Sequence, residues 1–151
     1  MARYQIEASL HIHAPGKQVY DIISDYRNGH PNILPKKYFK ELKVEKGGVG
    51  AGTEISFSMT VGGRTTHVRA SITEPAPGRV LVETVLDSDI VTTFTVEPFA
   101  DGHGCDVTIS TELNSHDGIF GIIERFVTKR MLLRIYTEEL QQLAEFAAKK
   151  T

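Results

Sequence analysis

His30 is the residue of this sequence best suited to acid–base chemistry. A histidine titrates near neutral pH, so it can act as an acid, as a base or as a polar gate. Removing a proton beside a carbonyl group needs a base and a donor that stabilises the enolate. Tyr26 lies close to His30 in the sequence, and His30 with Tyr38 or Arg130 could supply such a pair. The alternative is an exposed loop histidine without a role.

Three other patterns indicate chemistry less strongly. His11 and His13 lie two residues apart on a predicted strand, so both project from the same face. The apolar residues lie on the other face, so this pair faces solvent, and no carboxylate or cysteine lies at a spacing that would complete a metal site. The glycine-rich run 47–52 leads into a strand, which is typical of a turn and not of a phosphate-binding loop. Cys105, the single cysteine, fits a small buried residue. We expect no metal site, no cofactor and no internal disulfide.

The longest periodic segment, residues 115–150, must position these groups. Apolar residues recur there at steps of three and four, as on one face of an α-helix. About 30 residues at 1.5 Å each predict a rod of roughly 45 Å. The apolar face comprises Ile119, Ile122, Ile123, Phe126, Val127, Leu133, Tyr136, Leu140, Leu143, Ala144 and Ala147. The charged residues, including Glu138 and Glu139, are expected mostly on the opposite face.

Arg130 borders this apolar stripe, one turn after Phe126. Its stem could pack on the stripe while its guanidinium reaches water. It could instead lie at the edge of a cavity and contact the polar end of a ligand.

The segments before the long helix alternate between apolar and polar residues, which predicts strands. Residues 3–13 form the first strand, and Pro15 then suits the first turn of a short helix. A second short helix, or a loop, reaches to Leu34. About six strands joined by short turns follow, which predicts an antiparallel meander. We expect an α+β helix-grip fold, in which a curved sheet of about seven strands wraps around the C-terminal helix.

Length and charge limit the class of protein. With 151 residues and a formal net charge of −2, the chain is expected to form one domain, residues 1–151, without a general attraction to nucleic acid or anionic membrane. The sequence has no apolar run long enough for a transmembrane helix and no apolar signal core. We expect a cytoplasmic monomer or weak homodimer without integral membrane association.

Five short stretches occur in order along the chain. They are Ile12-His13-Ala14-Pro15, the segment 19–25, Gly50-Ala51-Gly52-Thr53, Ile72-Thr73-Glu74-Pro75 and the end of the long helix from Leu140 onward. Together they resemble the SRPBCC superfamily, also called START-like or birch-pollen-allergen-like, in its polyketide cyclase/dehydrase branch. The resemblance spans essentially the whole chain. It implies a cavity between the sheet and the long helix, used across the family for lipids, hormones, polyketides and other apolar molecules, but no single activity.

The inward positions of the strands and the helix are candidates for a cavity wall or for plain core. With the polar candidates, the predicted ligand-binding residues are Tyr26, His30, Tyr38, Phe57, Met59, Val68, Ala70, Ile72, Thr92, Phe94, Ile123, Phe126, Val127 and Arg130. The segment around His30 is expected to cap one end of the cavity and to leave an opening there.

Three functions follow from these expectations. The first is binding of a hydrophobic or amphipathic small molecule, such as a lipid or polyketide, between sheet and helix. The second is a polyketide cyclase- or dehydratase-like enzyme that uses His30 or a neighbour as a base, without a metal. The third is a protein-interaction module, which predicts a tight core and an exposed apolar patch.

Overall fold

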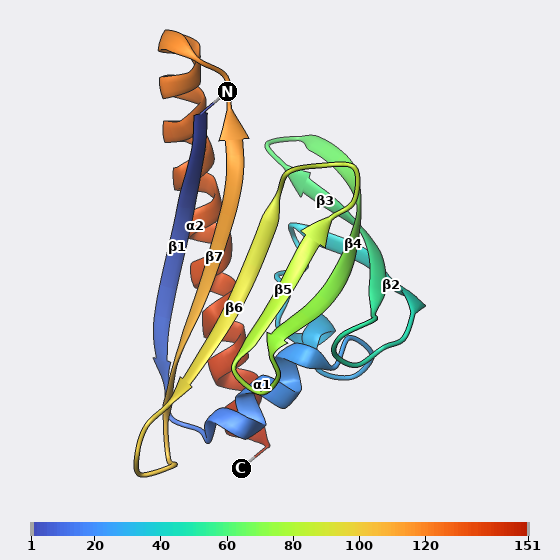
Figure 1. Cartoon of the computed structure of the whole chain (residues 1–151), viewed down its shortest axis with the longest axis vertical. Coiled ribbons are helices and arrows are strands. Elements are labelled where there is room, and N and C mark those ends of the chain that lie inside the picture. Colours follow the sequence, from blue (N-terminus) through green and yellow to red (C-terminus); the bar gives the residue numbers. More distant parts are fainter. Residues whose placement is uncertain (1, 151) are drawn as a thin grey trace.

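The computed structural model describes residues 2–150, which form a curved antiparallel sheet beside one long helix (Figure 1). The strands are β1 (Ala2–Ile12), β2 (Phe39–Lys46), β3 (Glu54–Val61), β4 (Arg64–Ala76), β5 (Val80–Val85), β6 (Val91–Pro98) and β7 (Cys105–Ser115). The helices are α1 (Gly16–Ser24), the 3-10 turn η1 (His30–Asn32) and α2 (Gly118–Lys149). The predicted helix-grip fold is confirmed, with one short α-helix and a single 3-10 turn after the first strand.

The sheet has the strand order β1-β7-β6-β5-β4-β3-β2, so β2 to β7 form a meander and β1 closes its far side. Gly62 and Gly63 both have positive φ, which suits the tight turn between β3 and β4. Strand β4 continues to Ala76, so the turn to β5 is short. In β1 the apolar residues alternate inward as predicted, and Ile6 and Ile12 are buried.

Glu74, from the fourth motif, joins three separate segments. Its Oε2 accepts a hydrogen bond from the Tyr20 hydroxyl of α1 at 2.6 Å, and its Oε1 accepts one from the backbone N–H of Ala51 at 2.7 Å. Gly50 has positive φ, and a Cβ there would collide with the Glu74 carboxylate. Three of the stretches that carry the resemblance therefore meet at Glu74, where they fix α1 against the end of β4.

The first half of α2 presents a different side to the sheet from the one that periodicity predicts. Ile119, Ile122, Ile123, Phe126 and Val127, predicted to face inward, are 54% to 71% exposed. One continuous helix face instead runs toward the sheet and the cavity, with residues three or four apart. It comprises Gly121, Arg125, Thr128, Leu132, Ile135, Glu139 and Leu143.

Contacts at the start of α2 explain this orientation. A Cβ at Gly121 would overlap the backbone carbonyl of His116, so the first turn packs directly on the segment that leaves β7. Arg125 donates a hydrogen bond to the Ser115 hydroxyl at 3.0 Å. Both contacts turn the side of α2 that carries Gly121 and Arg125 toward the sheet and leave the apolar side in solvent. This part of α2 lies beside β1 and β7 (Figure 1).

Candidate ligand-binding site

A cavity of about 460 Å³ lies between the concave face of the sheet and α2. Every strand from β2 to β7 contributes to its wall, as do η1 and the middle of α2. The apolar part of the wall is formed by Leu34, Phe39, Leu42, Ile55, Phe57, Met59, Val61, Val68, Ala70, Val85, Ile90, Phe94, Leu113, Met131 and Leu132. Its size and its largely apolar wall are those of a small-molecule site.

The cavity is closed at one end and open at the other. Phe94 and His30 are each only 2% exposed and mark the closed end. Thr66, His67 and Ser88 also line the cavity but are exposed. The opening therefore lies near the β3–β4 hairpin and the β5–β6 turn, and the expected opening beside His30 is wrong, because the segment that carries His30 folds back over α1.

Gly29 allows that fold. A Cβ at Gly29 would collide with the carbonyl of Ile22 in α1, so only glycine lets the chain approach so closely. His30 Nδ1 then donates to the carbonyl of Ile23 at 2.7 Å, since a carbonyl oxygen can only accept. This bond uses the proton on Nδ1 and turns Nε2 toward Glu83, 3.7 Å from its Oε2.

Tyr26 and Glu83 complete the surroundings of His30. The Tyr26 ring stacks on the imidazole with ring centroids 4.4 Å apart, and Phe94 contacts it edge-on at 5.4 Å. The Tyr26 hydroxyl donates to Oε2 of Glu83 at 2.5 Å. Burial, followed by the charge of Glu83, raises the pKa of Tyr26 well above its usual value, so the hydroxyl stays a donor.

A second polar group faces the same end from α2 and β7. The Thr111 and Tyr136 hydroxyls are hydrogen-bonded at 2.5 Å, and Thr92 joins Thr111 at 2.8 Å. Burial raises the pKa of Tyr136 to about 12. Glu139 lies one helical turn after Tyr136 and is 3% exposed. Burial first, and then the charge of Glu83, raises the pKa of Glu139 well above its usual value and so favours its protonated form.

Chemically, the closed end combines three kinds of polar group beside an apolar space. His30 offers the ring nitrogen Nε2, Glu139 offers a carboxyl group, and Tyr26 and Tyr136 offer hydroxyls. A buried carboxyl group with a raised pKa beside a histidine is suited to proton transfer or to holding a polar ligand head.

The structure brings half of the predicted site residues to the cavity. Those in the wall are His30, Phe57, Met59, Val68, Ala70, Thr92 and Phe94. Tyr26 and Ile72 are buried outside the wall, and Tyr38 is half-buried beside the core. Ile123, Phe126, Val127 and Arg130 are exposed on the outer side of α2, where the Arg130 guanidinium lies 5.9 Å from the Phe126 ring. Among the described residues no contact joins His30 to Tyr38 or Arg130.

Four polar residues of the closed end were not among the predicted site residues: Glu83, Thr111, Tyr136 and Glu139. Glu83 lies between Leu81 and Val85 on the face of its strand that points inward. Alternation along this strand would therefore have indicated a carboxylate facing the interior. Glu139 follows Tyr136 by three residues and precedes Leu143 by four, which places it within the apolar stripe. The prediction that it faces solvent is wrong, because the stripe continues on both sides of it.

Other parts of the molecule are less suited to binding a small molecule. A shallower hollow of about 470 Å³ lies on the outside, between α1 and the end of α2, and is lined by residues such as Lys17 and Asp21. Residues 2–150 contain no group of three His, Cys, Asp or Glu side chains close enough to bind a metal ion. No helix in this part of the chain has the length and apolar character needed to cross a membrane.

The family of the chain follows from its sequence. Residues 3–147 match the family described as "Polyketide cyclase / dehydrase and lipid transport". The chain belongs to this family. The comparison with curated protein sequences found no match.

Solved structures of the START-like superfamily share the fold over nearly the whole chain. The KanY protein has a TM-score of 0.84 and 27% identity, and the match covers 98% of this chain and 99% of that one. The Zhui aromatase/cyclase from Streptomyces sp. R1128 has a TM-score of 0.77 and 15% identity, covering 99% and 96%. A point mutant of norcoclaurine synthase from Thalictrum flavum has 0.74 and 15%, covering 99% and 96%. At such identities the last two show the fold alone.

Proposed function

We propose that this protein binds a hydrophobic or amphipathic small molecule in the cavity between the sheet and α2. The observation that carries the proposal is the cavity of about 460 Å³, apolar along its length and polar at its closed end. A ligand with an apolar body would bury that body against β3 to β6. Its polar end would lie beside Glu139 and Tyr136 at the closed end. The family's description, which names lipid transport, supports this class of ligand.

Filling the cavity tests the proposal. Ala70 is 2% exposed and its side chain lines the cavity, so Ala70→Phe places a ring in the ligand's space. Thr93 lies on the opposite face of the sheet, next to Phe94, so Thr93→Phe is a matched control. We expect wild type and Thr93→Phe to bind n-decanol in isothermal titration calorimetry, and Ala70→Phe to lose binding. Equal affinity in all three proteins would contradict a site in the cavity.

Acid–base catalysis in the same cavity is a second candidate function. It is favoured by the convergence of His30, Glu83 and Glu139 at the closed end. His30 Nε2 would remove a proton beside a substrate carbonyl, and the Glu139 carboxylic acid would donate to the developing enolate.

A linear poly-β-keto thioester is the substrate class for a test, with cyclised product measured by mass spectrometry. His30→Gln is expected to lower the rate by about a hundredfold. His103→Gln, in an exposed turn, is the control. Absence of any cyclised product from the wild-type protein would remove this candidate and leave ligand binding unaffected.

A further inference from the structure

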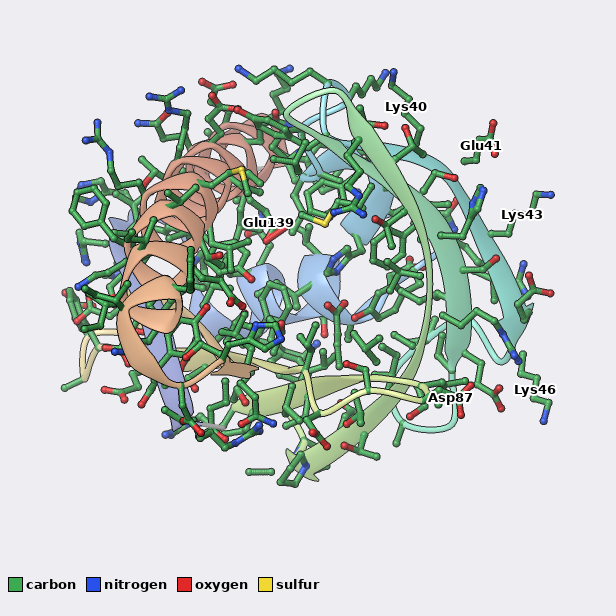
Figure 2. The ribbon with its side chains drawn as sticks, turned by 90° about the horizontal axis from the view of Figure 1, so that it is seen from above. Lys40, Glu41, Lys43, Lys46, Asp87 and Glu139 are labelled. Atoms are coloured by element: carbon green, nitrogen blue, oxygen red, sulfur yellow. The ribbon has the colours of Figure 1, made fainter. Side chains whose placement is uncertain are left out.

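Carboxyl groups determine the charge at the closed end of the cavity. Among the described residues of the wall, Glu83 and Glu139 carry carboxyl groups and none is Lys or Arg. The labelled lysines of β2 point away from the interior (Figure 2). An anionic head, such as the carboxylate of a fatty acid, would therefore meet like charge and no guanidinium or ammonium partner.

Glu139 is the carboxyl group that lacks a partner. It is 3% exposed, and its side chain has no hydrogen bond or ion pair with any residue of 2–150. Figure 2 shows it inside the space between α2 and the sheet. A buried polar group without a partner is costly, so a donor supplied by a ligand would be strongly favoured there.

Glu83 faces the same space with one oxygen already in use. Oε2 accepts from Tyr26, while no hydrogen bond within the described chain uses Oε1. His30 cannot satisfy Glu139, because its Nδ1 donates to Ile23 and its Nε2 is turned toward Glu83. Glu83 on β5 and Glu139 on α2 thus both have carboxyl oxygens that accept no hydrogen bond from residues 2–150, and both lie at the closed end of the apolar cavity.

From these contacts we propose that the cavity selects amphiphiles with a protonated amine, which Glu83 and Glu139 hold at the closed end. The inference rests on the proposed function, since it names the class of ligand for the same cavity. An ammonium offers three donors to the free carboxyl oxygens, in charge-assisted hydrogen bonds. Its charge also removes the repulsion between the two carboxylates, which a neutral hydroxyl cannot do.

Binding of an amine would be coupled to loss of a proton. Burial favours the protonated form of Glu139, and pairing with an ammonium favours the ionised form, so binding is expected to release this proton to solvent. The affinity for an amine is therefore expected to rise with pH while Glu139 is protonated in the empty protein. The affinity for an alcohol of the same length is expected to stay nearly constant over that range.

A series of ligands with one apolar body tests this selectivity. The probes are n-decylamine, n-decanol and decanoate, each titrated into the full chain by calorimetry in two buffers of different ionisation enthalpy. We expect the amine to bind tighter than the alcohol by roughly tenfold or more, and decanoate to bind weakest. About one proton should be released for each amine bound.

Glu139→Gln keeps the size of the side chain but cannot ionise. It is expected to bring the ratio of amine to alcohol affinity close to one and to abolish proton release. Glu138→Gln is the matched control, because Glu138 lies on the outer side of the same turn and pairs with Lys37 at 3.0 Å. That variant is expected to keep the wild-type ratio.

The outcomes separate the two proposals. Alcohol binding without a preference for the amine would overturn the inference and leave the proposed function intact. Tightest binding of decanoate would also overturn it. If none of the three probes binds, the proposed function fails together with the inference that rests on it.

Discussion

At the scale of single residues, the polarity of the site depends on two glutamates that the sequence places among apolar neighbours. Glu83 could have been found by strand parity, since Leu81 and Val85 on either side face inward. Glu139 could have been found from its spacing to Tyr136 and Leu143. The sequence could not show that Glu139 lacks a hydrogen-bond partner. Only the packed structure shows that no side chain among residues 2–150 forms a hydrogen bond with it.

Glu139→Gln should remove a pH-dependent loss of stability. The folded pKa of Glu139 is raised well above its value in the unfolded chain by burial and by the charge of Glu83. Below the unfolded pKa of about 4.3, both states hold the proton. As the pH rises from there through the folded pKa, the unfolded state releases its proton first and the native protein loses stability.

The advantage of the variant in free energy of unfolding is therefore expected to grow with pH across that window. Urea denaturation of wild type and Glu139→Gln at a series of pH values measures it. A difference that stays constant from pH 4 upward would show that Glu139 does not titrate in this way.

At the scale of elements, strand patterns predicted the sheet well and the helix pattern only partly predicted α2. Each strand has a dry and a wet face, so alternation reports its orientation directly. In α2 the predicted apolar stripe is correct from Tyr136 onward, where the helix packs on the core. In the first half, the contacts of Gly121 and Arg125 orient the helix, and no hydrophobic pattern encodes these contacts.

Two phenylalanine substitutions distinguish the packed from the exposed part of the fold. Phe94 is 2% exposed and Phe126 is 61% exposed. Phe94→Ala is expected to lower the free energy of unfolding by about 3–5 kcal/mol, because it enlarges the cavity and removes core contacts. Phe126→Ser is expected to change it by less than about 0.5 kcal/mol. Equal losses in urea denaturation would indicate that the outer side of α2 is covered in solution.

At the scale of the whole molecule, the protein combines a hollow interior with an exposed apolar helix face. The interaction-module hypothesis expects the exposed face but also a tight core, and the cavity of about 460 Å³ does not fit that second expectation. Sequence patterns predicted that a sheet would grip a helix. They could not predict the volume left between them, because that volume depends on the curvature of the sheet and on the side chains of six strands at once.

A ligand that occupies the cavity between the sheet and α2 is expected to stabilise the whole fold. A ligand that binds only the native state adds about 2.7 kcal/mol at a concentration a hundred times its Kd. For a domain of this size, each kcal/mol raises Tm by roughly 2–4 °C, so the expected increase is about 5–11 °C. Differential scanning calorimetry with n-decanol, or with the preferred amine, measures it. Ala70→Phe should show no such increase, because its ring occupies the space, whereas an equal increase in that variant would place the binding site elsewhere on the molecule.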